Sequence, residues 1–164
     1  QLTENGADTT LFWNRSFFNQ FCPLVTDSET CGLGYANMDE EQQVELRRAL
    51  VGSVNASCEE CPLGLDLTQA DFSVDVFAHT LIANCEQTAQ VIYNYTGSQT
   101  SEAASYEDLW KFTLVNYNAG GGCLAEGISG ANGANGLPLT WETVSPHLIG
   151  ACSSAVDYVN DISK

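Results

Sequence analysis

Apolar residues recur every three or four positions along most of this chain, and this period constrains its fold more than any other feature. One apolar face runs from Leu46 to Val54, after Asp39 and Gln42, which have the spacing of a helix capping box. A longer pattern spans about Thr68 to Tyr95, and a last one begins with Ser145 as N-cap and Pro146 at the first helical position. The positions expected to be buried in these two are Val74, Phe77, Leu81, Cys85, Thr88 and Ile92, then Val144, Leu148, Cys152, Ala155, Val159 and Ile162. No convincing run alternates with the period of two that strands show, so the sequence predicts a mostly α fold.

The stretch from Asp108 to Tyr117 predicts the central helix of the fold. It is apolar nearly all round, which is typical of a buried helix, and Ser105 with Asp108 forms a capping box before it. It ends at Ala119-Gly120, and a helix that stops at small residues leaves a surface where a ligand can approach the backbone. Residues 123–128 are compatible with a short helix, and glycines then recur at every third position from Gly127 to Gly136, which we interpret as a loop.

Seven cysteines predict a fold stapled by three disulfides with one thiol left over: Cys22, Cys31, Cys58, Cys61, Cys85, Cys123 and Cys152. We expect the local pairs Cys22–Cys31 and Cys58–Cys61, plus one bridge among the remaining three. The spare thiol is either buried or pairs with another chain. No second Cys-x-x-Cys and no paired histidines accompany Cys58 and Cys61, and a turn at Pro62 follows them, so a structural disulfide is favoured over a zinc or redox site. No metal or cofactor is expected.

The net charge of the chain limits the classes of molecule that it can bind. Lys and Arg total 5 against 21 Asp and Glu, a net charge of −16, which repels phosphate backbones and anionic lipid. No segment approaches the ~20 apolar residues of a membrane span. The chain begins with Gln1 rather than Met, and three sequons start at Asn14, Asn55 and Asn94. We therefore expect a secreted glycoprotein, extracellular or at the cell surface, without nucleic-acid partners or membrane insertion.

Residues 1–21 look like an irregular N-terminal arm that precedes a helical domain over residues 22–164. A polar start is followed by Leu11-Phe12-Trp13 and then Phe17, Phe18 and Phe21. So many aromatic side chains need cover. The arm therefore docks either on the chain's own core or on a neighbouring subunit. Docking on a neighbour would make a homo-oligomer, or an open polymer where the rotation does not close.

The segment Tyr117-Asn118-Ala119-Gly120 resembles a signature of the lytic transglycosylase family, which has a goose-type lysozyme-like fold. Ile82-Ala-Asn84 upstream and Leu137-Pro-Leu-Thr-Trp-Glu142-Thr143 downstream follow the order of that family's C-terminal half, and the resemblance covers about half of the chain. It implies a single lysozyme-like helical domain in which Tyr117, Asn118, Ala119 and Gly120 line a glycan cleft. The family cleaves the β-1,4 bond of peptidoglycan with one catalytic glutamate.

That glutamate is missing from its expected place. The family carries it in a Glu-Ser pair, and this sequence contains none. In the family a Gly-Leu turn follows the glutamate, and counting back from Gly64-Leu65 places Ala49 at the position of the glutamate. The acidic residues nearby in sequence are Glu45, Glu59 and Glu60. A general acid must be a carboxyl held near the leaving oxygen. The sequence therefore predicts a degenerate, non-catalytic lysozyme-like domain that serves as an assembly subunit or glycan-binding module. The alternative is an active peptidoglycan lyase or muramidase with a displaced acid.

Overall fold

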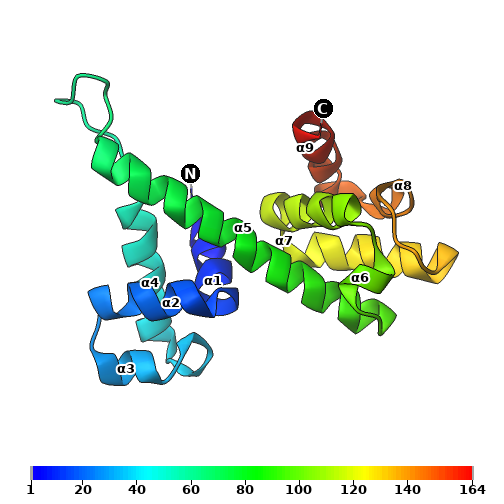
Figure 1. The fold of residues 1–164 in the computed structure, drawn as a ribbon, viewed down its shortest axis with the longest axis horizontal. Coiled ribbons are helices and arrows are strands. Elements are labelled where there is room, and N and C mark those ends of the chain that lie inside the picture. Colours follow the sequence, from blue (N-terminus) through cyan, green and yellow to red (C-terminus); the bar gives the residue numbers. More distant parts are fainter. Residues whose placement is uncertain (1, 164) are drawn as a thin grey trace. The chain divides into compact units, whose positions relative to one another are not determined.

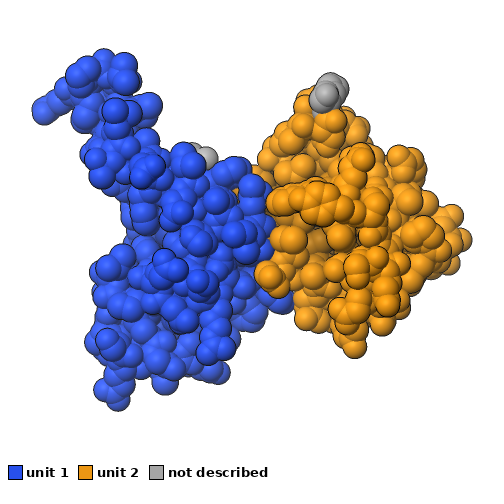
Figure 2. All heavy atoms as spheres, viewed as in Figure 1, with its two compact units in different colours: residues 1–83 blue, residues 84–164 orange. Residues whose placement is uncertain are grey.

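The computed structural model describes residues 2–163. Gln1 and Lys164, the outer ends of the predicted arm and domain, lie outside the described residues. Within residues 2–163 all regular elements are helices, and the only bridges between extended residues are isolated ones, so the predicted mostly α fold is confirmed. The chain divides into two compact units, residues 1–83 and 84–164 (Figure 2). The boundary falls inside one long helix and not after residue 21.

The first unit is a helical cluster closed by the first half of that long helix, α5 (Figure 1). Its elements are α1 (Glu4–Trp13), α2 (Arg15–Phe21), η1 (Cys22–Leu24), α3 (Ser28–Gly32), η2 (Tyr35–Asn37), α4 (Glu40–Ser53) and α5 (Leu67–Thr96). The capping box at Asp39 and Gln42 is present at the start of α4. The buried core of this unit comprises Ala7, Leu11, Phe17, Phe18, Phe21, Cys22, Tyr35, Met38, Leu46, Leu50 and Val76.

The predicted irregular arm is in fact helical. Thr3 caps α1 and the side chain of Asn14 caps α2, so the polar residues that looked like loop signals are helix starts. Phe17, Phe18 and Phe21 are buried in the core of the first unit. These side chains dock on the chain's own core, and α1 packs on α4 and supplies Leu11 to that core, whereas Phe12 is 50% exposed.

The predicted extent of α5 is confirmed, but its buried stripe is wrong at Val74, Phe77 and Cys85, which are exposed. Val74 is 68% exposed and Phe77 is 48% exposed, whereas Val76 and Ala83 are buried. Apolar residues occupy more than one face of this helix, and the face that carries Val76 joins the core of the first unit. Thr80, one turn further along this face, accepts a hydrogen bond from the hydroxyl of Thr10 on α1 at 2.9 Å.

The second unit packs a broken central helix against the C-terminal elements. After the last half of α5 come α6 (Thr100–Ala103), α7 (Tyr106–Asn135), α8 (Trp141–Val144), η3 (Ser145–His147), η4 (Gly150–Cys152) and α9 (Ser154–Ile162). α7 is capped by Ser105 as predicted and contacts α8, η3 and α9. The buried core of the second unit includes Phe112, Val115, Leu124, Ile128, Leu139, Val144, Leu148 and Val159.

Two predictions for this unit need correction. The glycine run Gly127–Gly136 lies mostly within α7 rather than in a loop. A Cβ on Gly127 would come within 2.9 Å of Leu148, and one on Gly130 within 2.6 Å of the His147 ring. These glycines therefore allow close packing inside a helix. The predicted last helix is two short 3-10 helices, η3 and η4, followed by α9, which begins only at Ser154. The positions predicted to be buried in this segment are buried except for Ile162, which is 53% exposed.

The disulfide framework agrees with the expected one. Cys22–Cys31 and Cys58–Cys61 are the local pairs, and Cys123–Cys152 is the third bridge. The remaining thiol, Cys85, is exposed on α5 rather than buried.

Candidate functional site

The predicted cleft segment is a sharp break inside α7. Gly120 has φ 86° and ψ 164°, a backbone region that is essentially restricted to glycine, and the chain resumes a helix at once (Figure 1). The rest of α7 has no other non-helical residue before Gly136. The small residues at the end of this segment therefore produce a change of helix direction.

The four predicted cleft residues differ in exposure. Tyr117 is half-buried and its ring stacks on Tyr158 of α9, with centroids 6.5 Å apart. Ala119 packs on the core of the second unit, while Asn118 and Gly120 are exposed. Burial raises the pKa of Tyr158, and the neighbouring Tyr117 adds to the shift. The segment thus offers an aromatic pair, an exposed amide and exposed backbone, which are groups suited to binding rather than to proton transfer.

A buried amide cluster lies beneath the break. Asn116 Nδ2 donates to the carbonyl oxygen of Asn84 at 3.1 Å and to Gln87 Oε1 at 3.0 Å. A Cβ on Gly121 would lie 3.1 Å from Gln87 Nε2, so this glycine lets the second half of α7 approach α5. The resemblance pointed to Asn84, but Asn116 and Gln87 were missed. An asparagine inside an otherwise apolar helix was the available signal for Asn116.

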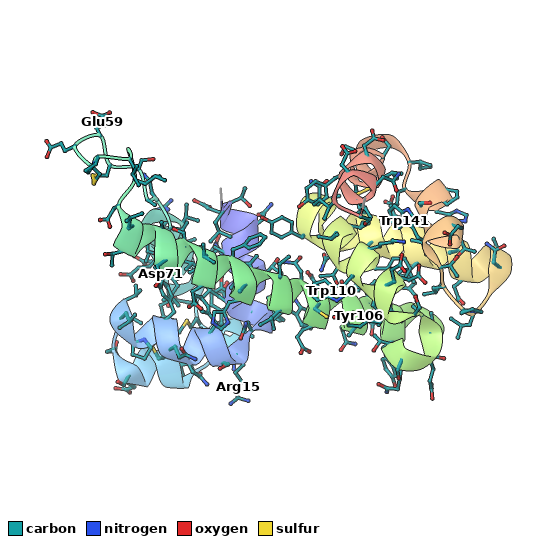
Figure 3. All side chains as sticks on the ribbon, turned by 45° about the horizontal axis from the view of Figure 1, so that its top comes forward. Arg15, Glu59, Asp71, Tyr106, Trp110 and Trp141 are labelled. Carbon is teal, nitrogen blue, oxygen red and sulfur yellow. A yellow bond between two sulfur atoms is a disulfide. The ribbon has the colours of Figure 1, made fainter. Side chains whose placement is uncertain are left out.

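The three candidate acids lie in the first unit and all are exposed. Glu45 is on the outer face of α4, and Glu59 and Glu60 are in the loop before α5 (Figure 3 labels Glu59). A glycosidic general acid is normally a carboxyl in a desolvated pocket. The structure gives none of these three side chains such surroundings.

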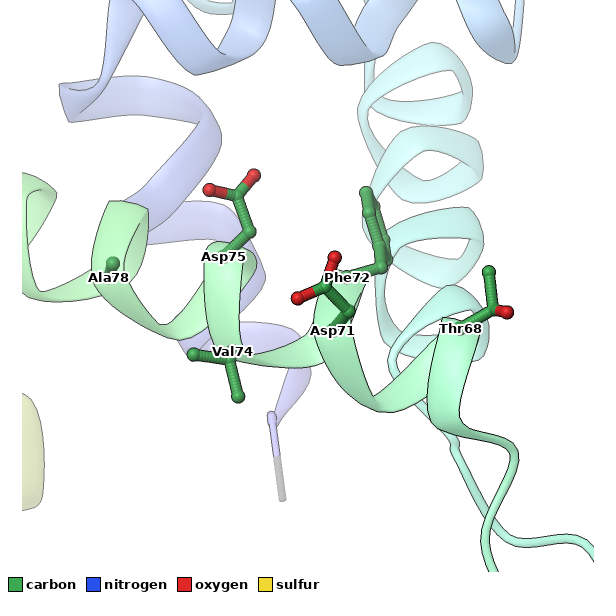
Figure 4. Close-up of a pocket in the computed structure, with 6 residues that line it drawn as sticks. All are labelled: Thr68, Asp71, Phe72, Val74, Asp75 and Ala78. Atoms are coloured by element: carbon green, nitrogen blue, oxygen red, sulfur yellow. The ribbon is translucent and has the colours of Figure 1, made fainter.

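Grooves within the described part of the first unit include one on α5 and one at the end of α4. One, of about 520 Å³, runs along the start of α5, where Asp71 and Asp75 point to the same side and Val74 to the other (Figure 4). Its lining is Thr68, Asp71, Phe72, Val74, Asp75 and Ala78. The other, of about 640 Å³, lies at the end of α4 and is lined by Leu2, Val51, Gly52, Val54, Asn55 and Ser57. Neither contains a candidate acid.

The polar networks of the first unit have structural roles. Tyr35 donates to Asp8 Oδ1 at 2.6 Å, and Arg47 donates to the same oxygen at 2.9 Å and to the Tyr35 hydroxyl at 3.1 Å. Burial and the bond to Asp8 raise the pKa of Tyr35 well above its ordinary value. This network joins η2 to α1 and α4.

The sequons are not equivalent in the structure. Asn14 is buried, and its Nδ2 lies 3.2 Å from the carbonyl oxygen of His79 and 3.0 Å from His79 Nδ1. A glycan would be attached through that nitrogen, so one at Asn14 would have to displace these contacts with His79. Asn55 and Asn94 are exposed.

Residues 2–163 contain no group of three His, Cys, Asp or Glu side chains arranged to hold a metal ion. None of the helices in that range is long and apolar enough to cross a membrane. Comparison with family models, curated proteins and solved structures finds no match to this chain.

Proposed function

We propose that this chain is a secreted, non-catalytic module that associates with copies of itself in an extracellular assembly. Three disulfides support export, since such bonds persist in oxidising compartments. The break at Gly120 and the aromatic pair beside it are compatible with a lysozyme-like scaffold whose proton donor has been lost. The exposure of Glu45, Glu59 and Glu60 supports the non-catalytic part of the proposal.

The observation that carries self-association is the exposed apolar surface of α5 within the first unit. Leu67 is 66% exposed, Val74 68% and Ile82 50%. Large apolar side chains that gather on one helix of a stable protein usually mark an interaction surface. Copies that each carry a charge of −16 repel one another, so contact between them has to use a face where apolar side chains outnumber carboxylates. In the N-terminal segment Phe17, Phe18 and Phe21 are packed in their own core, and Phe12, at 50% exposure, is the aromatic side chain left for such a contact.

Light scattering of the purified protein over a range of concentrations tests the assembly. We expect a molar mass that rises with concentration and a loss of this rise in Val74→Asp. Leu24→Asp is the matched control, because Leu24 is 77% exposed and lies outside α5. A strict monomer at high concentration, or equal loss in both variants, would refute self-association through α5.

Turbidity of purified bacterial cell walls tests the absence of catalysis. We expect no clearing by the native chain over a broad pH range. Clearing that disappears in Glu45→Gln, Glu59→Gln or Glu60→Gln would instead establish the alternative, an active peptidoglycan lyase or muramidase. Retention of the protein on the walls without clearing would favour the glycan-binding module over the assembly subunit.

Expression in a glycosylating host tests secretion through the glycan occupancy of each of the three sequons. Peptide mass spectrometry should find glycan on Asn55 and Asn94 and none on Asn14 in the folded, secreted protein. Occupancy of Asn14 in protein with native helicity would contradict the structure, because its Nδ2 is committed to His79.

A further inference from the structure

The disulfide Cys58–Cys61 differs from the other two in its surroundings. It lies in the segment between α4 and α5, which stands clear of the other helices of the first unit in Figure 1. Neither cysteine is buried, and Glu59 and Glu60 between them are exposed. Figure 3 shows Glu59 at the outer end of this loop.

The other two disulfides are each anchored in a core. Cys22 is 0% exposed and belongs to the buried cluster of the first unit, and Cys152 is 6% exposed and belongs to that of the second. Thiol–disulfide exchange needs a thiolate to reach a sulfur atom. Cys31 and Cys123, the other halves of these bridges, are half-buried like Cys58 and Cys61, but each of them packs against a core cluster. Cys58–Cys61 is therefore distinguished as the bridge that has no sulfur in or against either core cluster.

The loop keeps its shape by hydrogen bonds that do not involve sulfur. The backbone N–H of Cys58 donates to the carbonyl of Gly64 at 3.0 Å, that of Gly64 donates to Cys61 at 2.9 Å, and that of Asp66 donates to Ala56 at 3.0 Å. The disulfide spans a sequence separation of only three, and so short a loop contributes little to the stability of a fold. Opening the bond therefore leaves two cysteines close together in a folded protein, ready to close again.

We propose that Cys58–Cys61 is a thiol–disulfide exchange site that accepts an external thiolate. The attacking sulfur forms a bond to one cysteine sulfur, and the other cysteine leaves with the electron pair of the broken S–S bond and takes a proton from water. A second thiol of the attacking class then resolves the mixed disulfide. The products are two cysteine thiols on this chain and one new disulfide between the attacking thiols. This inference does not depend on the proposed function.

The charges of the loop select the attacking molecule. No helix begins at the pair, since α5 starts at Leu67 and Pro62 intervenes, so no helix N-terminus stabilises a thiolate on Cys58 or Cys61. Glu59 and Glu60 repel anionic thiols. The site therefore acts as an acceptor for thiols borne on neutral or cationic molecules. The source is either a small neutral or cationic thiol or a cysteine of another protein that is not acidic; a second copy of this chain, with its charge of −16, is disfavoured.

Brief treatment of the native chain with cysteamine, followed by acid quenching, alkylation and peptide mass spectrometry, tests the site. Cys58 and Cys61 should be labelled first, while the cysteines of the other two disulfides remain paired and the helical signal is unchanged. Replacing cysteamine with anionic mercaptoethanesulfonate should slow the reaction roughly fivefold at low salt, and the difference should shrink at high salt. The double change Glu59→Gln and Glu60→Gln should remove most of that difference.

Two outcomes would overturn the proposal: opening of Cys22–Cys31 or Cys123–Cys152 at the same rate, or a Cys58–Cys61 bond that stays closed under these conditions. Non-reducing electrophoresis of the concentrated chain tests the selection by charge. Disulfide-linked multimers that disappear in Cys85→Ser would overturn that selection, because the thiol donor would then be a second copy with a charge of −16.

Discussion

Substitution of Gly120 by alanine tests the origin of the break in α7. A Cβ at this position meets nothing within 4 Å, so the change adds no clash, and only the backbone conformation opposes it. A non-glycine residue held at φ 86° and ψ 164° costs about 1–3 kcal/mol. Alanine also restricts the unfolded chain, which returns about 0.4–1 kcal/mol. We expect the free energy of unfolding to fall by about 1–2 kcal/mol.

Gly122 is the matched control. It is also exposed, also has nothing within 4 Å of a Cβ, and lies in the same helix with an ordinary helical φ. Gly122→Ala should therefore raise the free energy of unfolding by about 0.5–1 kcal/mol. Urea denaturation followed by circular dichroism, with the disulfides intact, measures both. Equal effects of the two changes, or a Gly120→Ala protein as stable as the native chain, would refute the conclusion that backbone conformation requires glycine at the break.

The same helix allows a test of packing. Gly130 has an ordinary helical backbone, but a Cβ there would lie 2.6 Å from the His147 ring, whereas a Cβ on Gly133 meets nothing within 4 Å. Gly130→Ala should destabilise the protein by about 1–3 kcal/mol, as overpacking of a core does. Gly133→Ala should not destabilise the protein. The midpoints of urea denaturation of the two variants measure the difference in stability between them. A Gly130→Ala protein as stable as Gly133→Ala would show that His147 moves aside freely.

Three further changes probe the first unit by denaturation. Arg47→Met should lower the free energy of unfolding by about 1–2 kcal/mol, because it removes the bonds to Asp8 and Tyr35, while the exposed Arg48→Met should change it by less than about 0.5 kcal/mol. The folded state raises the pKa of Tyr35, so it holds the phenolic proton more tightly than the unfolded state. The contribution of Tyr35 to stability should therefore be constant below pH ~10 and be lost as the pH rises above it, and Tyr35→Phe should flatten the fall in this alkaline range. Asp39→Ala removes the capping box of α4 and should cost about 1 kcal/mol, which a shift of the thermal midpoint would reveal.

Local signals in the sequence predicted two helix starts correctly, whereas the last helix begins at Ser154 and not at the predicted Ser145. Asp39 and Ser105 cap helices as expected, because a cap is a contact between residues only three positions apart. The extent of α5 and the two local disulfides were also predicted correctly, because they too depend on residues close together in the chain. The N-terminal helices were missed because Thr3 and Asn14 were not interpreted as caps.

The candidate site was only partly predictable. The sequence singled out the segment that ends at Gly120, but not that this glycine breaks a continuous helix. It offered Glu45, Glu59 and Glu60 as acids, and it could not say that all three are exposed, since burial of a carboxyl depends on elements distant in the chain.

The sequence by itself determined that the chain is helical, acidic and cross-linked by disulfides, because period, charge and cysteine number are properties of neighbouring residues or of the composition. Only the tertiary structure decided which face of α5 is covered, that Gly127 and Gly130 sit against Leu148 and His147, and which thiol remains exposed. Each of these depends on contacts between residues far apart in the chain, and no local pattern specifies which apolar face or glycine will meet a partner.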